Sequence, residues 1–360
     1  MTSKTMKAAV IGLGWAGEQH LISYQQMGVE VVAISDAYAG ARDRIVAKYG
    51  IPYQYEDYRE LLERDDLTVV SVATPNYLHS PMAVAAMDAG KHVLCEKPLA
   101  RNAAEAKAMI DAAERNDRAL MVAFNHRQRG DVRLLKTHID NGGLGKIYHA
   151  KAFWWRRDGI PGMGGWFTSK DRAGGGPFID LGVHMLDMAL HLMGEPQVLS
   201  VSAAAYAELG ARGRGSRGDV AGSKSMDVED FATAFVRLEN GVTLTLEASW
   251  AMYREINDQF GVRLLGTEGG ALIDVVNYSD NDTLTLFSDV AGASAEIRPK
   301  VPASYGHYGV VKRFVEAVQA DDWSELTGRD GFQRSVVLEA CYRSAEEGRE
   351  VSISEILASL

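Results

Sequence analysis

The chain has 360 residues, of which 46% are hydrophobic, and its 38 basic against 48 acidic side chains give a formal net charge of -10 at pH 7. This length fits two domains with ample apolar cores, and the acidic balance argues against nucleic acid or an anionic membrane as a partner, so we expect small-molecule ligands. Cys95 and Cys341 are too few for a disulfide framework or a paired-thiolate zinc site, and the first apolar run, Ala8–Leu13, is too short for a signal sequence or membrane span, so we expect a cytoplasmic protein.

The first third of the chain alternates short apolar runs with longer amphipathic ones, which is the pattern of a parallel sheet covered by helices. The predicted strands are Lys7–Ile11, Glu30–Ser35, Thr68–Val72, His92–Cys95 and Ala119–Ala123. The predicted helices are Ala16–Met27, Gly40–Tyr49, Ser80–Ala89 and Ala103–Asn116. We therefore predict an α/β domain with a parallel sheet over residues 1–125.

The remaining residues, 126–360, read as an α+β domain with a large, open, mostly antiparallel sheet. Its predicted strands are Ile147–Trp155, Val198–Ala207, Asp227–Leu238, Val242–Met252, Gln259–Gly266 and Gly270–Val276. Its predicted helices are Val132–Asn141, Gly182–Leu192, Tyr308–Ala320 and Asp330–Glu347, and the C-terminal helices could pack back on the first domain.

One segment, Gly210–Ser225, is rich in Gly, Arg and Ser and has no apolar period. Its Arg-Gly repeats could suggest RNA binding, but a single short tract in an acidic protein favours a solvated loop. We predict a mobile loop between two strands there.

A glycine-rich turn follows the first predicted strand and opens the first predicted helix. Its residues are Gly12, Leu13, Gly14, Trp15, Ala16 and Gly17. The three glycines permit a tight turn, close approach of a pyrophosphate to the helix N-terminus, and close helix-strand packing. Asp36, at the end of the next strand, can bind a ribose diol and would repel a 2′-phosphate. The motif therefore predicts NAD, while Arg42 keeps NADP possible.

Polar residues also follow the third predicted strand, at the edge where doubly wound sheets bind their ligands. Thr74, Pro75 and Asn76 stand directly after it, and His79 comes three residues later. For Asn76, a cofactor contact and a plain turn are equally supported by the spacing. For His79, local capping or packing is favoured over a cofactor contact.

The segment after Gly174, Gly175 and Gly176 places three polar residues in an apolar helical pattern, with Asp180 and His184 four apart and Asp187 three further on. Helical offsets of four and three put these side chains on one face, and the glycines would let that face approach a ligand. A carboxylate beside an imidazole suits proton transfer. Zinc or manganese ligation is the alternative, which we disfavour because a nicotinamide enzyme needs no Lewis acid when an ammonium group is available.

These motifs together resemble the Gfo/Idh/MocA family of oxidoreductases over nearly the whole chain. The resemblance uses the glycine turn, the Thr74-Pro75-Asn76-x-x-His79 run, the Gly90–Pro98 run, Asn125-x-Arg127, and Asp180-x-Gly182-x-His184-x-x-Asp187. It implies a Rossmann domain and a C-terminal domain whose open sheet builds homodimers or homotetramers. It also implies that Lys97 and His184 lie at the nicotinamide, that Lys97-Pro98 is often cis, and that Glu96 and Asn125 belong to the cofactor site.

The expected chemistry is oxidation of a secondary alcohol, which needs a base and a positive group for developing alkoxide charge. We assign His184 as the base, Lys97 as the positive group, and Asp180 to orient the imidazole or bind a neighbouring hydroxyl. Asp187 is expected to be structural. No metal is expected.

The substrate pocket is predicted from aromatic and basic residues. Trp166 is the preferred sugar contact among several aromatic residues. Arg127 could reach the pocket, with an interdomain salt bridge as its equal alternative. Tyr305, His307 and Tyr308 could close the site or merely begin a helix.

We therefore predict an NAD-dependent dehydrogenase or reductase acting on a ring carbon of a sugar, glycoside or cyclitol. Two alternatives stay open: a glycoside hydrolase that uses tightly bound NAD with transient oxidation, and a non-catalytic dinucleotide sensor. Released sugar without accumulating NADH would indicate the former. A sensor would not require Lys97 or His184.

Overall fold

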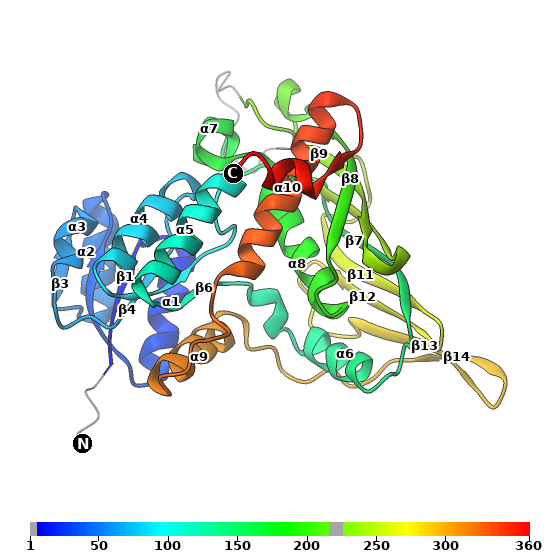
Figure 1. Cartoon of the computed structure of the whole chain (residues 1–360), viewed down its shortest axis with the longest axis horizontal. Coiled ribbons are helices and arrows are strands. Elements are labelled where there is room, and N and C mark those ends of the chain that lie inside the picture. Colours follow the sequence, from blue (N-terminus) through cyan, green and yellow to red (C-terminus); the bar gives the residue numbers. More distant parts are fainter. Residues whose placement is uncertain (1–5, 216–225) are drawn as a thin grey trace. The chain divides into compact units, whose positions relative to one another are not determined.

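The computed structural model of the chain describes residues 6–215 and 226–360 (Figure 1). These residues divide into two compact units. Unit 1 joins the described residues up to Asn125 with Tyr305–Ser335, and unit 2 joins the described residues of His126–Ser304 with Val336–Leu360. The second division falls inside the long helix α10 (Arg329–Glu347).

Unit 1 contains a six-stranded parallel sheet with the order β3-β2-β1-β4-β5-β6. Its strands are β1 (Lys7–Ile11), β2 (Glu30–Ser35), β3 (Tyr53–Tyr55), β4 (Val69–Val72), β5 (His92–Cys95) and β6 (Leu120–Val122). Its helices are α1 (Trp15–Gln26), α2 (Ala39–Tyr49), α3 (Tyr58–Leu62), α4 (Asn76–Asp88), α5 (Ala103–Asn116) and α9 (Gly306–Gln319). This arrangement confirms the predicted Rossmann fold.

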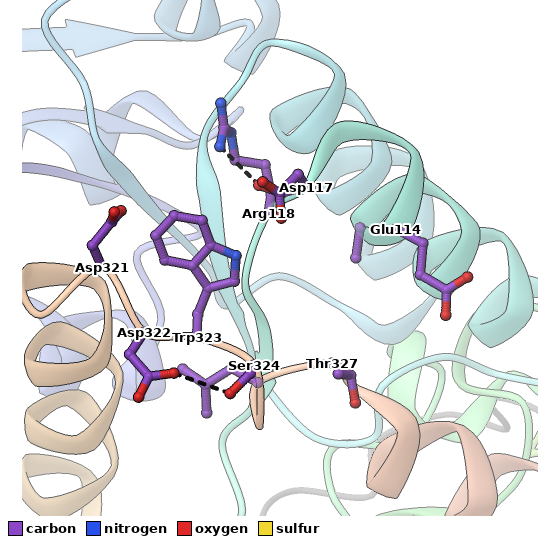
Figure 2. A pocket seen from close by; sticks show the side chains of 10 residues that line it. Glu114, Asp117, Arg118, Asp321, Asp322, Trp323, Ser324 and Thr327 are labelled. Carbon is purple, nitrogen blue, oxygen red and sulfur yellow. Dashed lines mark hydrogen bonds between the residues drawn. The ribbon is translucent and has the colours of Figure 1, made fainter.

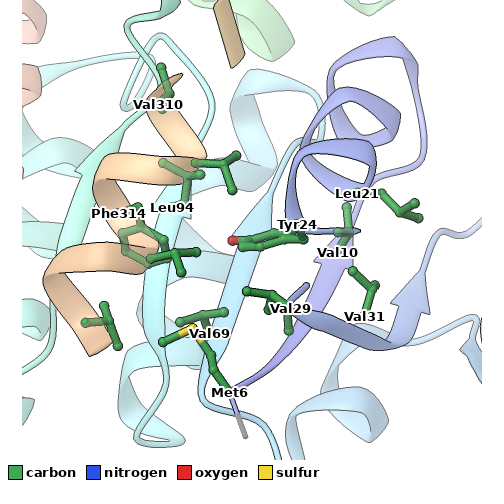
Figure 3. Close-up of a cluster of buried hydrophobic side chains, with 14 of the residues drawn as sticks. Met6, Val10, Leu21, Tyr24, Val29, Val31, Val69, Leu94, Val310 and Phe314 are labelled. Atoms are coloured by element: carbon green, nitrogen blue, oxygen red, sulfur yellow. The ribbon is translucent and has the colours of Figure 1, made fainter. Parts of the chain in front are cut away.

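The core of unit 1 shows how a late helix completes an early domain. Tyr24 of α1 and Phe314 of α9 are fully buried and lie over apolar side chains of β1, β4 and β5 (Figure 3). The Tyr24 hydroxyl hydrogen-bonds to the Ser71 hydroxyl over 2.9 Å, which satisfies a polar group that burial would otherwise penalise. Helix α9 is therefore part of unit 1, although it begins at Gly306, 184 residues after the last strand of this sheet ends at Val122.

Unit 2 contains a nine-stranded sheet with the order β14-β13-β12-β11-β7-β10-β9-β8-β15. Its strands are β7 (Ile147–Arg156), β8 (Val198–Tyr206), β9 (Phe231–Leu238), β10 (Thr243–Ser249), β11 (Asp258–Gly266), β12 (Gly270–Val276), β13 (Leu284–Val290), β14 (Ala293–Ile297) and β15 (Val351–Ser352). Among these pairs only β7 and β10 run parallel. The predicted open, mostly antiparallel sheet is confirmed.

The helices and short turns of unit 2 are α6 (Gly130–Asp140), α7 (Lys170–Ala173), α8 (Val183–Leu192), α11 (Ile353–Leu357), the π-helix η3 (Phe178–Gly182), and the 3-10 turns η1 (Asn125–Gln128, beginning at the unit boundary), η2 (Trp166–Thr168), η4 (Gly210–Arg212) and η5 (Glu239–Gly241). Helix α8 lies against β7, β10 and β11. Strands β10 and β12 alternate buried with half-buried residues, as expected when one sheet face packs on helices.

Several predicted boundaries were wrong for identifiable reasons. Helix α4 begins at Asn76, so His79 lies within it and Pro81 is inside rather than near its start. Strand β3 was missed because it has three residues, none fully buried, and β13 and β14 lack a clear apolar alternation. Of the predicted loop Gly210–Ser225, the first residues form η4, whereas 216–225 lie outside the described residues.

Within the described ranges, no helix combines the length and apolar content required to cross a lipid bilayer.

Candidate active site

The glycine turn of unit 1 divides its three glycines between two tasks. Gly12 has φ +89°, and a Cβ there would lie 2.4 Å from the Ala73 carbonyl oxygen. A Cβ on Gly17 would lie 1.9 Å from the Gly12 carbonyl oxygen. A Cβ on Gly14 would meet no atom within 4 Å. The outer glycines are therefore required by packing, whereas the middle one leaves an open backbone face at the start of α1, where a pyrophosphate could bind.

Asp36 fixes this turn from the end of β2. One carboxylate oxygen accepts the Leu13 amide over 2.8 Å and the other accepts the Tyr38 amide over 2.9 Å. Arg42 donates to the Asp36 backbone carbonyl over 2.6 Å and lies 3.6 Å from a Glu56 carboxylate oxygen. The Arg42 guanidinium is thus already beside acidic and carbonyl oxygens, which favours a ribose diol over a 2′-phosphate.

Two buried polar atoms near the carboxyl ends of β4 and β6 lack hydrogen-bond partners within the described part of the chain. They are Oγ1 of Thr74 and Oδ1 of Asn125. An unpaired buried polar atom costs free energy, and a bound polar group at this edge could supply the missing partner. Together with the open face at Gly14, these atoms fit the NAD predicted from the sequence.

His79 connects two of the predicted cofactor segments. Its Nδ1 lies 2.8 Å from the Pro98 carbonyl oxygen and its Nε2 lies 2.8 Å from the Thr74 carbonyl oxygen. Burial lowers the pKa of His79, so the ring is neutral near pH 7 and donates to only one of these carbonyls. These contacts favour the packing alternative for His79 over a cofactor contact, and they fix the cis Lys97-Pro98 turn next to β4.

Glu96, also predicted at the cofactor, points its carboxylate at protein groups. One oxygen lies 3.0 Å from His20 Nε2 and 3.2 Å from His307 Nε2, and the other accepts the Lys97 amide over 3.1 Å. Burial opposes ionisation, but the hydrogen bonds from the two histidines outweigh it and hold the pKa of Glu96 well below its ordinary value. Glu96 is thus a buried anion that shapes the backbone before Lys97.

In unit 2, the glycine run serves packing, which corrects the expectation that it lets a ligand approach. A Cβ on Gly175 would lie 2.0 Å from the Tyr342 hydroxyl, and one on Gly176 would lie 2.1 Å from the Glu229 carbonyl oxygen. The Glu229 carboxylate accepts the amides of Gly176 and Phe178 over 2.9 and 3.1 Å. Burial raises the pKa of Glu229. This side chain, which the sequence did not identify, fixes the start of the π-helix.

Asp180 lies in the π-helix η3, and His184 in the first turn of α8. The Trp250 indole donates to Asp180 over 3.1 Å, whereas the His184 ring is buried against His126 and Trp154, with centroid separations of 4.6 and 5.6 Å. A π-helix has a wider turn than an α-helix, so the ideal offsets assumed from the sequence do not apply across residues 178–182. Trp250 had no sequence signal beyond its position in a predicted strand.

Asp187 does not join Asp180 and His184. Its buried carboxylate accepts a hydrogen bond from Nε of Arg127 over 2.9 Å and a second one from Nη2. A carboxylate oxygen of Glu195 lies 3.7 Å from the same guanidinium. Asp187 is therefore structural, as expected. Arg127 forms this ion pair within unit 2, which favours its salt-bridge alternative over a substrate contact and corrects the idea that the bridge joins the domains.

A polar cluster on the sheet beside His184 was not identified from the sequence. The Asp258 carboxylate accepts hydrogen bonds from Nε1 of Trp154 over 2.9 Å and from Nε of Arg156 over 2.7 Å. Arg156 also donates a hydrogen bond to the Tyr278 hydroxyl over 2.7 Å. Burial disfavours the charged guanidinium, but Tyr278 and the carboxylates of Asp258 and Asp180 outweigh it and raise its pKa. Arg156 and Asp180 are therefore close enough for their charges to interact.

The preferred sugar contact, Trp166, lies in the turn η2. Its ring is half-buried and stacks on Phe167 with a centroid separation of 3.7 Å. The contact of Trp166 with a sugar stays a prediction.

Unit 1 also has a surface cavity of about 460 Å³ beside Arg118 and Trp323 (Figure 2). Arg118 lies two residues before β6, and Trp323 packs on His92, the first residue of β5. The cavity is therefore at the amino-terminal edge of the parallel strands. Doubly wound sheets bind nucleotides at the opposite edge, so this cavity is distinct from the glycine turn.

Both parts of the chain are similar to known protein families. Residues 6–124 match the model of the oxidoreductase family with an NAD-binding Rossmann fold, and residues 132–272 match the Gfo/Idh/MocA C-terminal domain. The chain is 32% identical over 361 residues to D-glucoside 3-dehydrogenase of Escherichia coli (strain K12), covering 98% of this chain and 99% of that protein. It is 28% identical over 394 residues to levoglucosan dehydrogenase of Pseudarthrobacter phenanthrenivorans, covering 99% and 100% of the two chains.

A solved structure of levoglucosan dehydrogenase in complex with NADH and levoglucosan superposes with a TM-score of 0.82 at 27% identity, covering 97% of this chain and 99% of that one. The two family models cover the glycine turn, the Glu96-Lys97-Pro98 segment and the Asp180–Asp187 segment. The chain therefore belongs to the Gfo/Idh/MocA family and is an NAD-dependent oxidoreductase acting on CH–OH groups.

Proposed function

We propose that the chain oxidises a ring hydroxyl of a sugar, glycoside or cyclitol, or reduces the matching ketone, with Lys97, Asp180 and His184 as its catalytic residues. The observation that supports this most directly is the setting of His184. Its imidazole is buried against Trp154 and His126, in the same unit as Asp180, whose carboxylate is oriented by Trp250. A buried imidazole held by ring contacts is a suitable base for proton transfer from an alcohol, and Asp180, four residues earlier, supplies an oriented carboxylate.

Each residue has a separate task in this proposal. When bound, NAD accepts the hydride from the carbinol carbon. A ring nitrogen of His184 takes the hydroxyl proton, and the Lys97 ammonium group stabilises the negative charge that develops on the oxygen. Asp180 orients the imidazole or accepts a hydrogen bond from a neighbouring hydroxyl.

The cofactor contacts are proposed along one edge of the parallel sheet. The turn Gly12–Gly17 would bind the pyrophosphate, Asp36 the ribose diol, and the side chains of Thr74, Asn76 and Asn125 the remaining polar groups. Thr74 and Asn125 are supported by their unpaired buried oxygen atoms.

For the substrate we propose a neutral ring. The guanidinium of Arg156 already pairs with Asp258 and interacts with Asp180, so these carboxylates compete for it with the anionic group of a uronate or a sugar phosphate. Trp154 presents an aromatic surface beside the base, which suits the apolar face of a pyranose. The relatives named for a D-glucoside and for levoglucosan have neutral substrates by name, in agreement with this class.

The test is a panel of neutral pyranosides and inositols with NAD, followed by the absorbance of NADH. We expect turnover of at least one neutral substrate and much weaker turnover of its 6-carboxylate analogue. Measured NADH binding with no turnover across the panel would reject the dehydrogenase proposal. Sugar release without NADH accumulation would favour the hydrolytic alternative.

We also propose that the protein works in the cytoplasm as a homodimer or homotetramer that associates through the open face of the nine-stranded sheet. The two cysteines are free and buried, which fits a reducing compartment. The half-buried alternate residues of β10 and β12 supply a sheet face for association. Light scattering after gel filtration tests this assignment: a monomer at micromolar concentration would contradict it.

A further inference from the structure

The buried cluster formed by His20, Glu96 and His307 lies outside the chemistry proposed above. All three residues belong to unit 1, and their side chains are at most 9% exposed. His20 is on α1, Glu96 directly follows β5, and His307 is in the first turn of α9. The cluster therefore joins three segments far apart in the sequence, and one of them leads directly into Lys97.

His307 contacts two parts of the cofactor unit at once. Its Nε2 lies 3.2 Å from the Glu96 carboxylate, whose other oxygen accepts the Lys97 amide over 3.1 Å. The edge of its ring also meets Trp15, with a centroid separation of 5.2 Å and an interplanar angle of 84°. Trp15 is 69% exposed and belongs to the glycine turn. One side chain thus contacts both the cofactor turn and the anion that shapes the Lys97 backbone.

The charge states of His20 and Glu96 are those that a hydrogen bond between them requires. Burial lowers the pKa of His20, so its ring is neutral near pH 7 and donates Nε2–H to Glu96. One oxygen of the Glu96 carboxylate then accepts hydrogen bonds from His20 and His307, and the other accepts a hydrogen bond from the Lys97 amide. Removing the His307 donor leaves a buried anion short of one hydrogen bond, and the carboxylate is free to turn.

A metal ion is the competing explanation, because ligand atoms of the three residues lie within 4.8 Å of one another. A metal-bound imidazole normally donates its other ring N–H to an acceptor. Nδ1 of His20 is buried and has no partner among residues 6–215 and 226–360. A metal on Nε2 would place an unsatisfied proton there, whereas the hydrogen-bonded form leaves only an unused lone pair. The geometry therefore favours hydrogen bonding.

We propose that His307 is a positioning residue with two separable actions. Through Glu96 it fixes the backbone that presents Lys97, and through Trp15 it fixes the glycine turn that binds the dinucleotide. The first action rests on the proposed dehydrogenase function. The second rests only on NAD binding.

Two substitutions separate these actions. His307→Gln retains an N–H donor at the reach of Nε2 and loses the aromatic edge. His307→Phe retains an aromatic edge and loses the donor. We expect His307→Gln to raise the dissociation constant of NADH about fivefold with kcat nearly unchanged. We expect His307→Phe to lower kcat about 10- to 100-fold with the NADH dissociation constant within twofold of the wild type.

The matched controls are His92→Gln and His92→Phe. His92 is another buried histidine of unit 1 that meets a tryptophan edge, since its ring lies 4.5 Å from that of Trp323. Its Nδ1 accepts a hydrogen bond from the Ala119 amide over 3.1 Å, so its described side-chain contacts are to Ala119 and Trp323. Both His92 variants should leave kcat and the NADH dissociation constant within twofold of the wild type.

Parallel changes of kcat and NADH affinity in the two His307 variants, or no change in either, would overturn the proposal, because a purely structural residue would behave in that way. So would one equivalent of zinc per purified chain that is lost in both variants. If the wild type binds NADH but turns over no sugar, the dehydrogenase proposal fails by itself. The NADH dissociation constants of the two variants then still decide the action through Trp15.

Discussion

The two units hold their proposed functional residues by different means. In unit 1 the glycine turn is fixed by contacts of its own backbone and by Asp36, which is 23 residues from Leu13 in the sequence. In unit 2 Asp180 is oriented by Trp250, 70 residues away, and Arg156 by Asp258, 102 residues away. Most residues of the nucleotide site are therefore close together in the sequence. The residues of the proposed proton-transfer site come from distant strands, which meet only in the folded sheet.

The largest expected effect separates chemistry in unit 2 from cofactor binding in unit 1. His184→Ala removes the proposed base, so kcat/KM for the sugar should fall about 10³-fold, within the range typical of general base catalysis. The NADH dissociation constant should stay within twofold of the wild type. Steady-state kinetics and NADH fluorescence titration measure the two quantities.

The control for this change is His149→Ala, which removes a half-buried histidine that hydrogen-bonds to Thr243 elsewhere on the sheet. It should leave kcat/KM nearly unchanged. A His184→Ala variant with wild-type turnover, or with an equal loss in the control, would contradict the assignment of the base.

The next effect tests the division of tasks among the glycines of unit 1. Gly17→Ala places a methyl group against the Gly12 carbonyl oxygen, so the free energy of unfolding should fall by about 3 kcal/mol. Gly14→Ala places its methyl group in open space and should leave the free energy of unfolding within about 0.5 kcal/mol, while weakening NADH binding at least tenfold.

Urea unfolding and NADH titration of the two variants provide the measurements. Gly14→Ala with normal NADH affinity would show that the pyrophosphate does not approach this backbone face. Gly17→Ala with wild-type stability would mean that the turn relaxes around the added methyl group.

The smallest effect concerns acid stability of unit 1. Burial, with a smaller contribution from Arg118, lowers the pKa of His92 from 6.5 to about 4. The unfolded chain therefore binds this proton more readily, and the stabilisation present above pH 6.5 is lost as the pH falls towards 4. Between pH 7.5 and 5.0 the wild type should lose about 1 to 2 kcal/mol more free energy of unfolding than His92→Gln, allowing for solvent screening.

Denaturant unfolding of both proteins at the two pH values measures this difference. An identical loss in the wild type and in His92→Gln would show that His92 titrates normally in the folded state. The acid sensitivity would then be assigned to other groups, such as the buried Glu96 or His79, whose pKa values are also lowered.

An element could be predicted when its burial leaves an apolar pattern in its own sequence. Strands such as β1 and β4 are buried on both faces and read as continuous apolar runs. Strands β13 and β14 have mostly half-buried or exposed residues, so no apolar period marks them. The residues Asp180 and His184 were found by their spacing. Trp250, Glu229 and Asp258, which hold the surrounding geometry, were not, because nothing local distinguishes a supporting side chain from ordinary core.

The sequence by itself determined the Rossmann fold, the NAD turn, and the family, because these depend on short motifs with backbone requirements, such as the positive φ at Gly12. Only the tertiary structure decided what the second set of glycines does, how Arg127 is paired, and that His307 joins Glu96 to Trp15. The reason is physical: hydrogen bonds and ring contacts between distant segments form only after both sheets and α9 have assembled, and their partners obey no spacing along the chain.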